Sequence, residues 1–178
     1  TWDAGSSTVT NTDGSITSSV RANPSAGFSI VTYTATGSVS TVGHGLGVAP
    51  EFIIGKSRDG AYNWMVGHEK IGWTKYINLN TTAAQVTTVN AWNNTAPTSS
   101  VFTIGSSNNQ LNTNGADYVA YCFAPVDGYS SFGSYTGNGS ADGPFVYTGF
   151  RPRWVVRKKT DSTGFGWYIV DADRDSFN

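Results

Sequence analysis

The chain has 178 residues, a formal net charge of −1, 13% charged side chains and 13% aromatic side chains. This length suits one domain with a real core, and the near-neutral balance excludes the basic surface that duplex nucleic acid requires. Glu51 and Glu69 are the only glutamates and straight-chain helix formers are scarce, whereas β-branched and aromatic residues abound. The composition therefore predicts an all-β protein.

The first half of the chain contains three predicted strands and one predicted hairpin. "GFSIVTYT", from Gly27, is a strand that ends at a Gly-Ser turn. "EFIIGKS" begins directly after Pro50, which suits the first residue of a strand because proline has no N–H to donate. The turn signal "RDGAYN" separates it from "WMVGH", so we expect a hairpin over Pro50–His68.

The candidate binding residues lie in the middle segment 76–111 and directly before it. In "AWNNT", Trp92 offers an apolar ring face, and Asn93 and Asn94 offer amide donors and acceptors. A neutral sugar needs this combination of stacking and directional hydrogen bonds. Trp73 and Tyr76, in "GWTKY", are further candidates for the same site. The alternative is that Trp92 fills the edge of the sandwich and the two asparagines form a turn, with a similar structural role for Trp73 and Tyr76.

The last third of the chain contains another strand and a second predicted hairpin. Alternation in "YVAYCFAP" places Cys122 on one face with Tyr118 and Ala120, as a small buried apolar residue. "RWVVRKK" and "WYIVD", separated by the turn signal "TDSTGFG", predict a hairpin over Pro152–Asp171.

The two hairpins belong to an internal repeat. A shift of 102 aligns "PEFIIGKSRD" with "PRWVVRKKTD", and a shift of 101 aligns "NTDGS" from Asn11 with "NTNGA" from Asn112. The related copies run over about 11–75 and 112–178, and 76–111 is unduplicated. We expect a single domain, an antiparallel β-sandwich of jelly-roll or lectin-like type, built by stacking the two copies so that each hides the apolar face of the other.

The sequence supports metal and anion sites less strongly than the candidate sugar-binding residues. Asp171, Asp173 and Asp175 alternate in "DADRD" and could bind Ca²⁺, but a solvated turn balanced by Arg174 is the preferred interpretation. We therefore predict no metal and no cofactor. The only basic cluster, Arg151–Lys159, could contact an anionic polysaccharide, or form a solvated strand face or a subunit contact.

Long phrases of the sequence resemble a known domain. They are "TWDAGSSTVTNTDGSITSSVRANPSAGFSIVTYT", "VGHGLGVAPEFIIGKSRD", "WNNTAPTSSVFTIGS", "YVAYCFAPVDGYSSFGSYTGNGSADGPFVYTGFRPRWVVRKKTD" and the closing D-x-x-R. Together they resemble a domain of tail fibres and other tail-tip proteins of tailed phages, especially phages of marine bacteria and cyanobacteria. The resemblance covers nearly the whole chain and brings no catalytic residues with it. It also implies a piece of a longer polypeptide.

The resemblance implies a virion appendage protein that acts outside the cell at the host surface. We expect a receptor-binding module for a host polysaccharide or surface protein, which self-associates as a homotrimer and contacts other tail proteins. The alternatives are a purely structural or oligomerising fibre segment and, third, a polysaccharide depolymerase. No apolar stretch reaches 18 residues and no nucleotide, zinc or serine-hydrolase motif occurs, so we predict neither membrane insertion nor enzymatic activity.

Overall fold

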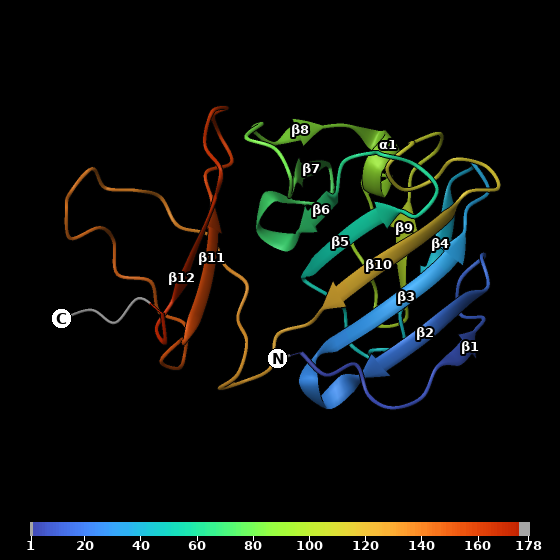
Figure 1. Ribbon diagram of the computed structural model, residues 1–178, viewed down its shortest axis with the longest axis horizontal. Helices are drawn as coiled ribbons and strands as arrows, with labels where there is room; N and C mark the ends of the chain where they lie inside the picture. The colour runs from blue at the N-terminus through green and yellow to red at the C-terminus, as the bar shows by residue number, and fades with distance from the viewer. Residues whose placement is uncertain (1, 175–178) are drawn as a thin grey trace.

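The computed structural model describes residues 2–174 and is almost entirely β-structure (Figure 1). Two 3₁₀ turns, η1 (Pro24–Ala26) and η2 (Glu69–Ile71), and one short helix, α1 (Val89–Trp92), interrupt the strands. The strands are β1 (Val9–Asn11), β2 (Ser18–Asn23), β3 (Phe28–Thr34), β4 (Ser40–Gly43), β5 (Phe52–Ser57), β6 (Met65–His68), β7 (Lys75–Asn78), β8 (Val86–Thr87), β9 (Val101–Ile104), β10 (Asp117–Phe123), β11 (Trp154–Lys158) and β12 (Trp167–Asp171).

The largest sheet has eight strands in the order β1-β2-β3-β10-β5-β6-β7-β8. Strand β10 comes late in the chain but lies between β3 and β5, antiparallel to both. Its burial alternates from Asp117 to Cys122, because Tyr118, Ala120 and Cys122 are fully buried on one face. The predicted face of Cys122 is therefore confirmed, and β10 is the strand that joins the two halves of the sheet.

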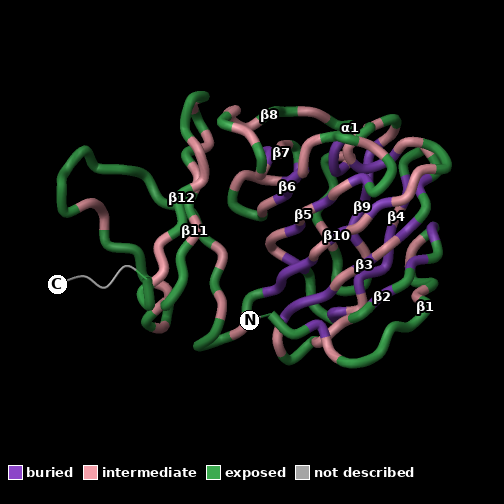
Figure 2. The backbone as a smooth tube through the Cα atoms, viewed as in Figure 1, coloured by how far each residue is buried: buried purple, intermediate pink, exposed green. Residues whose placement is uncertain are grey.

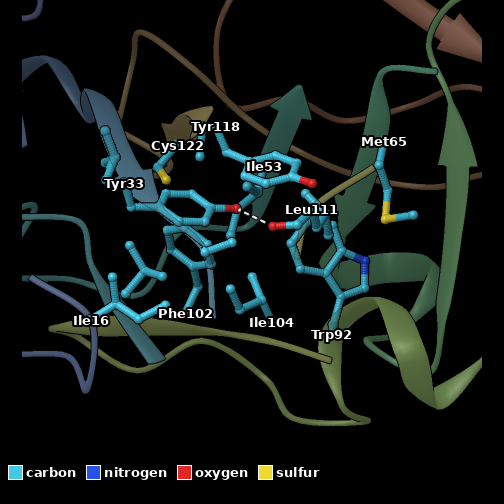
Figure 3. Packing of buried hydrophobic residues seen from close by; sticks show 14 of the residues in the cluster. Ile16, Tyr33, Ile53, Met65, Trp92, Phe102, Ile104, Leu111, Tyr118 and Cys122 are labelled. Atoms are coloured by element: carbon cyan, nitrogen blue, oxygen red, sulfur yellow. Dashed lines mark hydrogen bonds between the residues drawn. The ribbon is translucent and has the colours of Figure 1, made fainter. Parts of the chain in front are cut away.

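A second layer packs on this inner face and completes the sandwich. It consists of the β4–β9 pair, with Ile16, Leu111 and α1 beside it. Figure 3 shows Phe102 and Ile104 of β9 pointing at Tyr33 and Ile53 of the large sheet. The one polar group of Tyr33 is satisfied inside this core, because its hydroxyl donates to the Leu111 carbonyl at 2.9 Å.

The hairpin β11–β12 stands beside the sandwich as a separate two-stranded sheet (Figure 1). Its turn is attached to the loop after β7, since Gln85 N–H donates to the Thr160 carbonyl at 2.8 Å and Gly164 N–H donates to the Thr82 carbonyl at 2.9 Å. At its other end Trp154 meets the ring of Trp2 edge-on at 5.2 Å. Figure 2 shows that most of residues 125–174 are exposed or half-buried, in contrast to the sandwich.

The predicted all-β fold with antiparallel sheets is confirmed, as are the hairpins over Pro50–His68 and Pro152–Asp171. The expected stacking of two copies differs from the structure. The layer opposite the large sheet comes from β4 and from β9 of the unduplicated segment, and no residue beyond Ala124 belongs to the described main core. The physical reason is that β10, which the repeat assigns to the predicted second copy, pairs with β3 and β5 of the predicted first copy. Duplication of the whole unit stays a prediction.

Candidate functional site

Two of the predicted binding residues lie inside the core. Trp92, at the end of α1, is 1% exposed, and Trp73 is 7% exposed. The ring of Trp73 meets that of Trp92 edge-on, with centroids 5.5 Å apart. Both rings lie over Gly67 of β6, where an added Cβ would come within 2.5 Å of the Trp73 ring. The prediction that Trp92 and Trp73 stack on a sugar is therefore wrong, because neither ring has a face open to solvent.

Asn93 and Asn94 shape the chain rather than a binding face. Both have positive φ, of 51° and 53°, a conformation that asparagine tolerates better than most residues. Asn93 is the C-cap of α1, and its N–H donates to the Val89 carbonyl at 2.9 Å. The cap at Asn93 thus ends the helix directly after Trp92, whose indole is buried. This corresponds to the alternative in which the asparagines form a turn.

Tyr76 is the one predicted residue that lines an open pocket. It lies on β7, half-buried, with its ring packed against the main core. The pocket beside it has a volume of about 650 Å³. We call it the amide pocket, and its lining residues come from four separated segments: Ala61, Tyr62, Asn63; Tyr76; Val86, Thr87, Thr88, Asn90; and Ser107, Asn108, Asn109, Gln110.

A second tyrosine gives the amide pocket an exposed aromatic wall. Tyr62 lies in the turn between β5 and β6 and is 43% exposed. Its ring lies over Gly60, where a Cβ would stand 2.3 Å from the ring carbon Cε2. Glycine at that position therefore allows the ring to lie close against the turn. Tyr62 and Tyr76 together supply two aromatic rings, one exposed and one half-buried, in the same pocket.

Amide side chains form another part of the lining, on the loop of residues 107–110 between β9 and β10. The loop is held from inside, because the buried hydroxyl of Tyr118 donates to the Asn109 carbonyl at 3.1 Å. Asn108 fixes its own turn by accepting from Gln110 N–H at 2.8 Å. The Gln110 Oε1 atom is buried and has no hydrogen-bond partner among the described residues.

The lining carries no charge. None of the described residues that form the amide pocket is Asp, Glu, Lys, Arg or His. The pocket therefore offers no pair of carboxylates for acid–base chemistry on a glycosidic bond. Within residues 2–174, no group of three or more His, Cys, Asp or Glu side chains is placed to hold a metal ion. Chemically, the pocket is suited to stacking and to neutral hydrogen bonding.

Several side chains of the predicted metal and anion sites contact residues close to them in the chain. Asp171 pairs with Arg174 at 3.0 Å and accepts from Asp173 N–H at 3.0 Å, while Asp175 lies outside the described residues. In the basic cluster, Arg157 lies 5.1 Å from the ring centre of Tyr168 and Lys159 lies 4.6 Å from that of Phe165. These cations therefore lie against aromatic rings of their own hairpin.

Sequence reasoning missed Tyr62 and the loop 107–110. Both carry a visible signal, a Gly-Ala-Tyr-Asn turn and the polar run "GSSNNQ". Nothing in the order of residues shows that they meet, because the pocket closes only when the β5–β6 turn, β7–β8 and the β9–β10 loop converge.

Comparison with protein families matches residues 1–178 to a domain of unknown function (DUF7483). No curated protein and no solved structure matches the chain. Of the helices that the structure describes in residues 2–174, none has the length and apolar character needed to cross a membrane. The function must therefore be argued from the amide pocket and the surfaces around it.

Proposed function

We propose that this chain, which belongs to the DUF7483 family of domains of unknown function, is a binding module for a neutral glycan on a host cell surface. The observation that carries the proposal is the amide pocket, whose lining combines Tyr62 and Tyr76 with the amide side chains of residues 108–110. The setting in a phage tail appendage, outside the cell and among other tail proteins, rests on the resemblance of the sequence.

The chemistry of the amide pocket favours an uncharged sugar. A pyranose presents C–H groups on one face, which stack on a tyrosine ring, and hydroxyls around its edge, which pair with amides. An anionic sugar would find no cation in the lining. Binding to a neutral sugar should change little with ionic strength, because screening acts on charge–charge attraction.

The pocket is also partly organised before any ligand arrives. The Tyr118 hydroxyl and the Asn108 side chain fix the loop, and the Thr88 hydroxyl accepts from Asn90 N–H at 3.1 Å on the neighbouring wall. A rigid site loses less conformational entropy on binding, which matters for a weak ligand such as a sugar.

A second candidate function, a structural or oligomerising fibre segment, is favoured by another observation. The β11–β12 hairpin and the loop before it expose large apolar side chains, among them Phe145 at 91% and Tyr147 at 83%. Exposed apolar surface of this kind marks protein contacts, which would fit the expected homotrimer. The two functions are compatible, since the hairpin and the amide pocket involve different residues.

The test is a glycan array and a panel of bacterial cells probed with the fluorescently labelled chain. Tyr62→Ala removes the exposed wall of the amide pocket, and Tyr147→Ala removes an equally large exposed ring outside it. We expect saturable binding to neutral glycans, reduced tenfold or more in Tyr62→Ala and unchanged in Tyr147→Ala. Absence of binding to every glycan and cell, together with a stable oligomer in light scattering, would reject the binding module in favour of the structural segment.

A further inference from the structure

The two hairpins of the chain pair their strands in the same register. In β5–β6, Phe52 lies opposite His68 and Ile53 opposite Gly67. In β11–β12, Trp154 lies opposite Asp171 and Val155 opposite Val170. Shifts of 102 for the first strand and 103 for the second convert one set of pairs into the other. The shifts that align the sequences therefore also align the register of the paired strands, and each residue of β11 has a counterpart in β5.

The surroundings of the two first strands differ at one edge. Strand β5 pairs with β6 on one side and with β10 on the other. Strand β11 pairs with β12, and no third strand within residues 2–174 joins that sheet. The edge of β11 that corresponds to the β10 side of β5 is thus unoccupied by any described strand.

The backbone groups of β11 show which residues face this edge. Ala172 N–H donates to the Arg153 carbonyl at 2.8 Å, so Arg153 bonds toward β12. Hydrogen bonding alternates along an antiparallel strand, and therefore Trp154, Val156 and Lys158 direct their N–H and C=O groups to the other edge. An open strand edge of this kind is a template for another strand.

Side-chain exposure also shows that the second hairpin is less covered than the first. Val155 and Tyr168 are 40% and 49% exposed. Their counterparts in the first hairpin, Ile53 and Met65, are fully buried beneath the second layer of the sandwich. The face of the second hairpin that corresponds to the core-facing side of the first is therefore open.

We propose that the free edge of β11 accepts one further antiparallel strand of the β10 type, supplied by another repeat of this domain family. The first hairpin defines the occupant, because its corresponding edge is filled by β10 with Phe52 opposite Phe123 and Lys56 opposite Val119. The added strand would lie opposite Trp154 to Lys158 with the same alternation of large and small side chains. This strand addition does not depend on the glycan-binding proposal, since it uses none of the residues that line the amide pocket.

The experiment uses the whole chain and a fluorescent peptide with the sequence of residues 114–126, in which serine replaces the cysteine. Anisotropy measures binding, and amide hydrogen exchange locates it. Val156→Pro removes an N–H from the free edge without touching the bonds to β12, and Val156→Ala trims the same side chain but keeps the N–H. A peptide with proline at the position of Ala120 serves as the non-strand control.

We expect saturable binding, new exchange protection at residues 154–158, at least a tenfold loss of affinity in Val156→Pro, and near wild-type affinity in Val156→Ala. Retained hairpin protection in unliganded Val156→Pro shows that the variant is folded. The wild-type protection map decides the matter independently of that variant. Absent binding, equal binding of the proline-containing peptide, or protection at β5 instead of β11 would overturn the proposal. So would self-association of the chain through β11, which would make a second β11 the occupant.

Discussion

The ring of Trp73 meets the ring of Trp92 edge-on at 5.5 Å and 89°, and both rings lie over Gly67. Replacing Trp92 by alanine would leave a large cavity in the main core. Buried Trp-to-Ala changes cost about 3–5 kcal/mol. We expect a loss of unfolding free energy of that order in urea titration, and a smaller loss for Trp92→Phe. Stability equal to wild type would show that the indole is not part of the core.

The thiol of Cys122 should be inert in the folded protein. It is fully buried on β10, and burial raises its pKa to about 12. Because the thiolate is the reacting form, iodoacetamide at pH 8 should modify Cys122 only as fast as the sheet opens. Mass spectrometry with and without urea measures this difference. Rapid modification under native conditions would contradict the placement of β10 at the centre of the sheet.

The stability of the protein should fall as the pH is lowered from 7 to 5. Burial lowers the pKa of His44 below its usual value of 6.5, partly offset by the Thr98 carbonyl and the carboxylate of Asp13. Burial also lowers the pKa of His68. Below pH 6.5 the unfolded chain therefore binds protons that the folded chain does not, which favours unfolding until the pH falls below the folded-state values.

Urea unfolding at several pH values gives the slope of the unfolding free energy against pH. In His44→Gln the slope between pH 5 and 7 should decrease, and the part due to His68 should remain. The slope, rather than the absolute stability, is diagnostic, since His44 also accepts from Leu46 N–H at 3.2 Å. An unchanged slope would mean that His44 is not held neutral by the fold.

The hydroxyl of Tyr118 should position the loop that forms the amide pocket. In Tyr118→Phe the Asn109 carbonyl and Thr113 N–H each lose a part-buried hydrogen bond, and a hydrogen bond of this kind contributes about 0.5–1.5 kcal/mol. We expect a folded protein with lower stability and faster amide exchange at residues 107–113. Exchange unchanged at these residues would show that the loop is held by other contacts.

Local features of the fold could be predicted from the sequence. Alternation in "YVAYCF" identified the buried face of β10, and the turn signals located both hairpins. The pairing of β10 with β3 and β5 could not be predicted, because it joins residues more than 60 positions apart by backbone bonds that carry no sequence code. The expected stacking of two copies differs from the structure for the same reason, since it depends on which distant strands pair.

The site was harder to predict than the fold. The sequence pairs Trp92 with two amides as a candidate stacking face, but the αL cap at Asn93 ends the helix and the indole lies inside the core. Tyr76 lines the amide pocket, but its role in binding stays a prediction, and the sequence did not indicate the other residues that line the pocket. Tyr62 and Asn109 come from turns on different strands, and only the folded sheet brings them together.

The central claim, that the amide pocket binds a neutral glycan, is tested most directly by mapping backbone amide chemical shifts during titration with neutral oligosaccharides. We predict saturable shifts at residues 61–63, 86–90 and 107–110, insensitive to salt and absent in Tyr62→Ala, with Tyr147→Ala responding as wild type. Shifts confined to the β11–β12 hairpin, or no shifts with any neutral oligosaccharide, would contradict the claim.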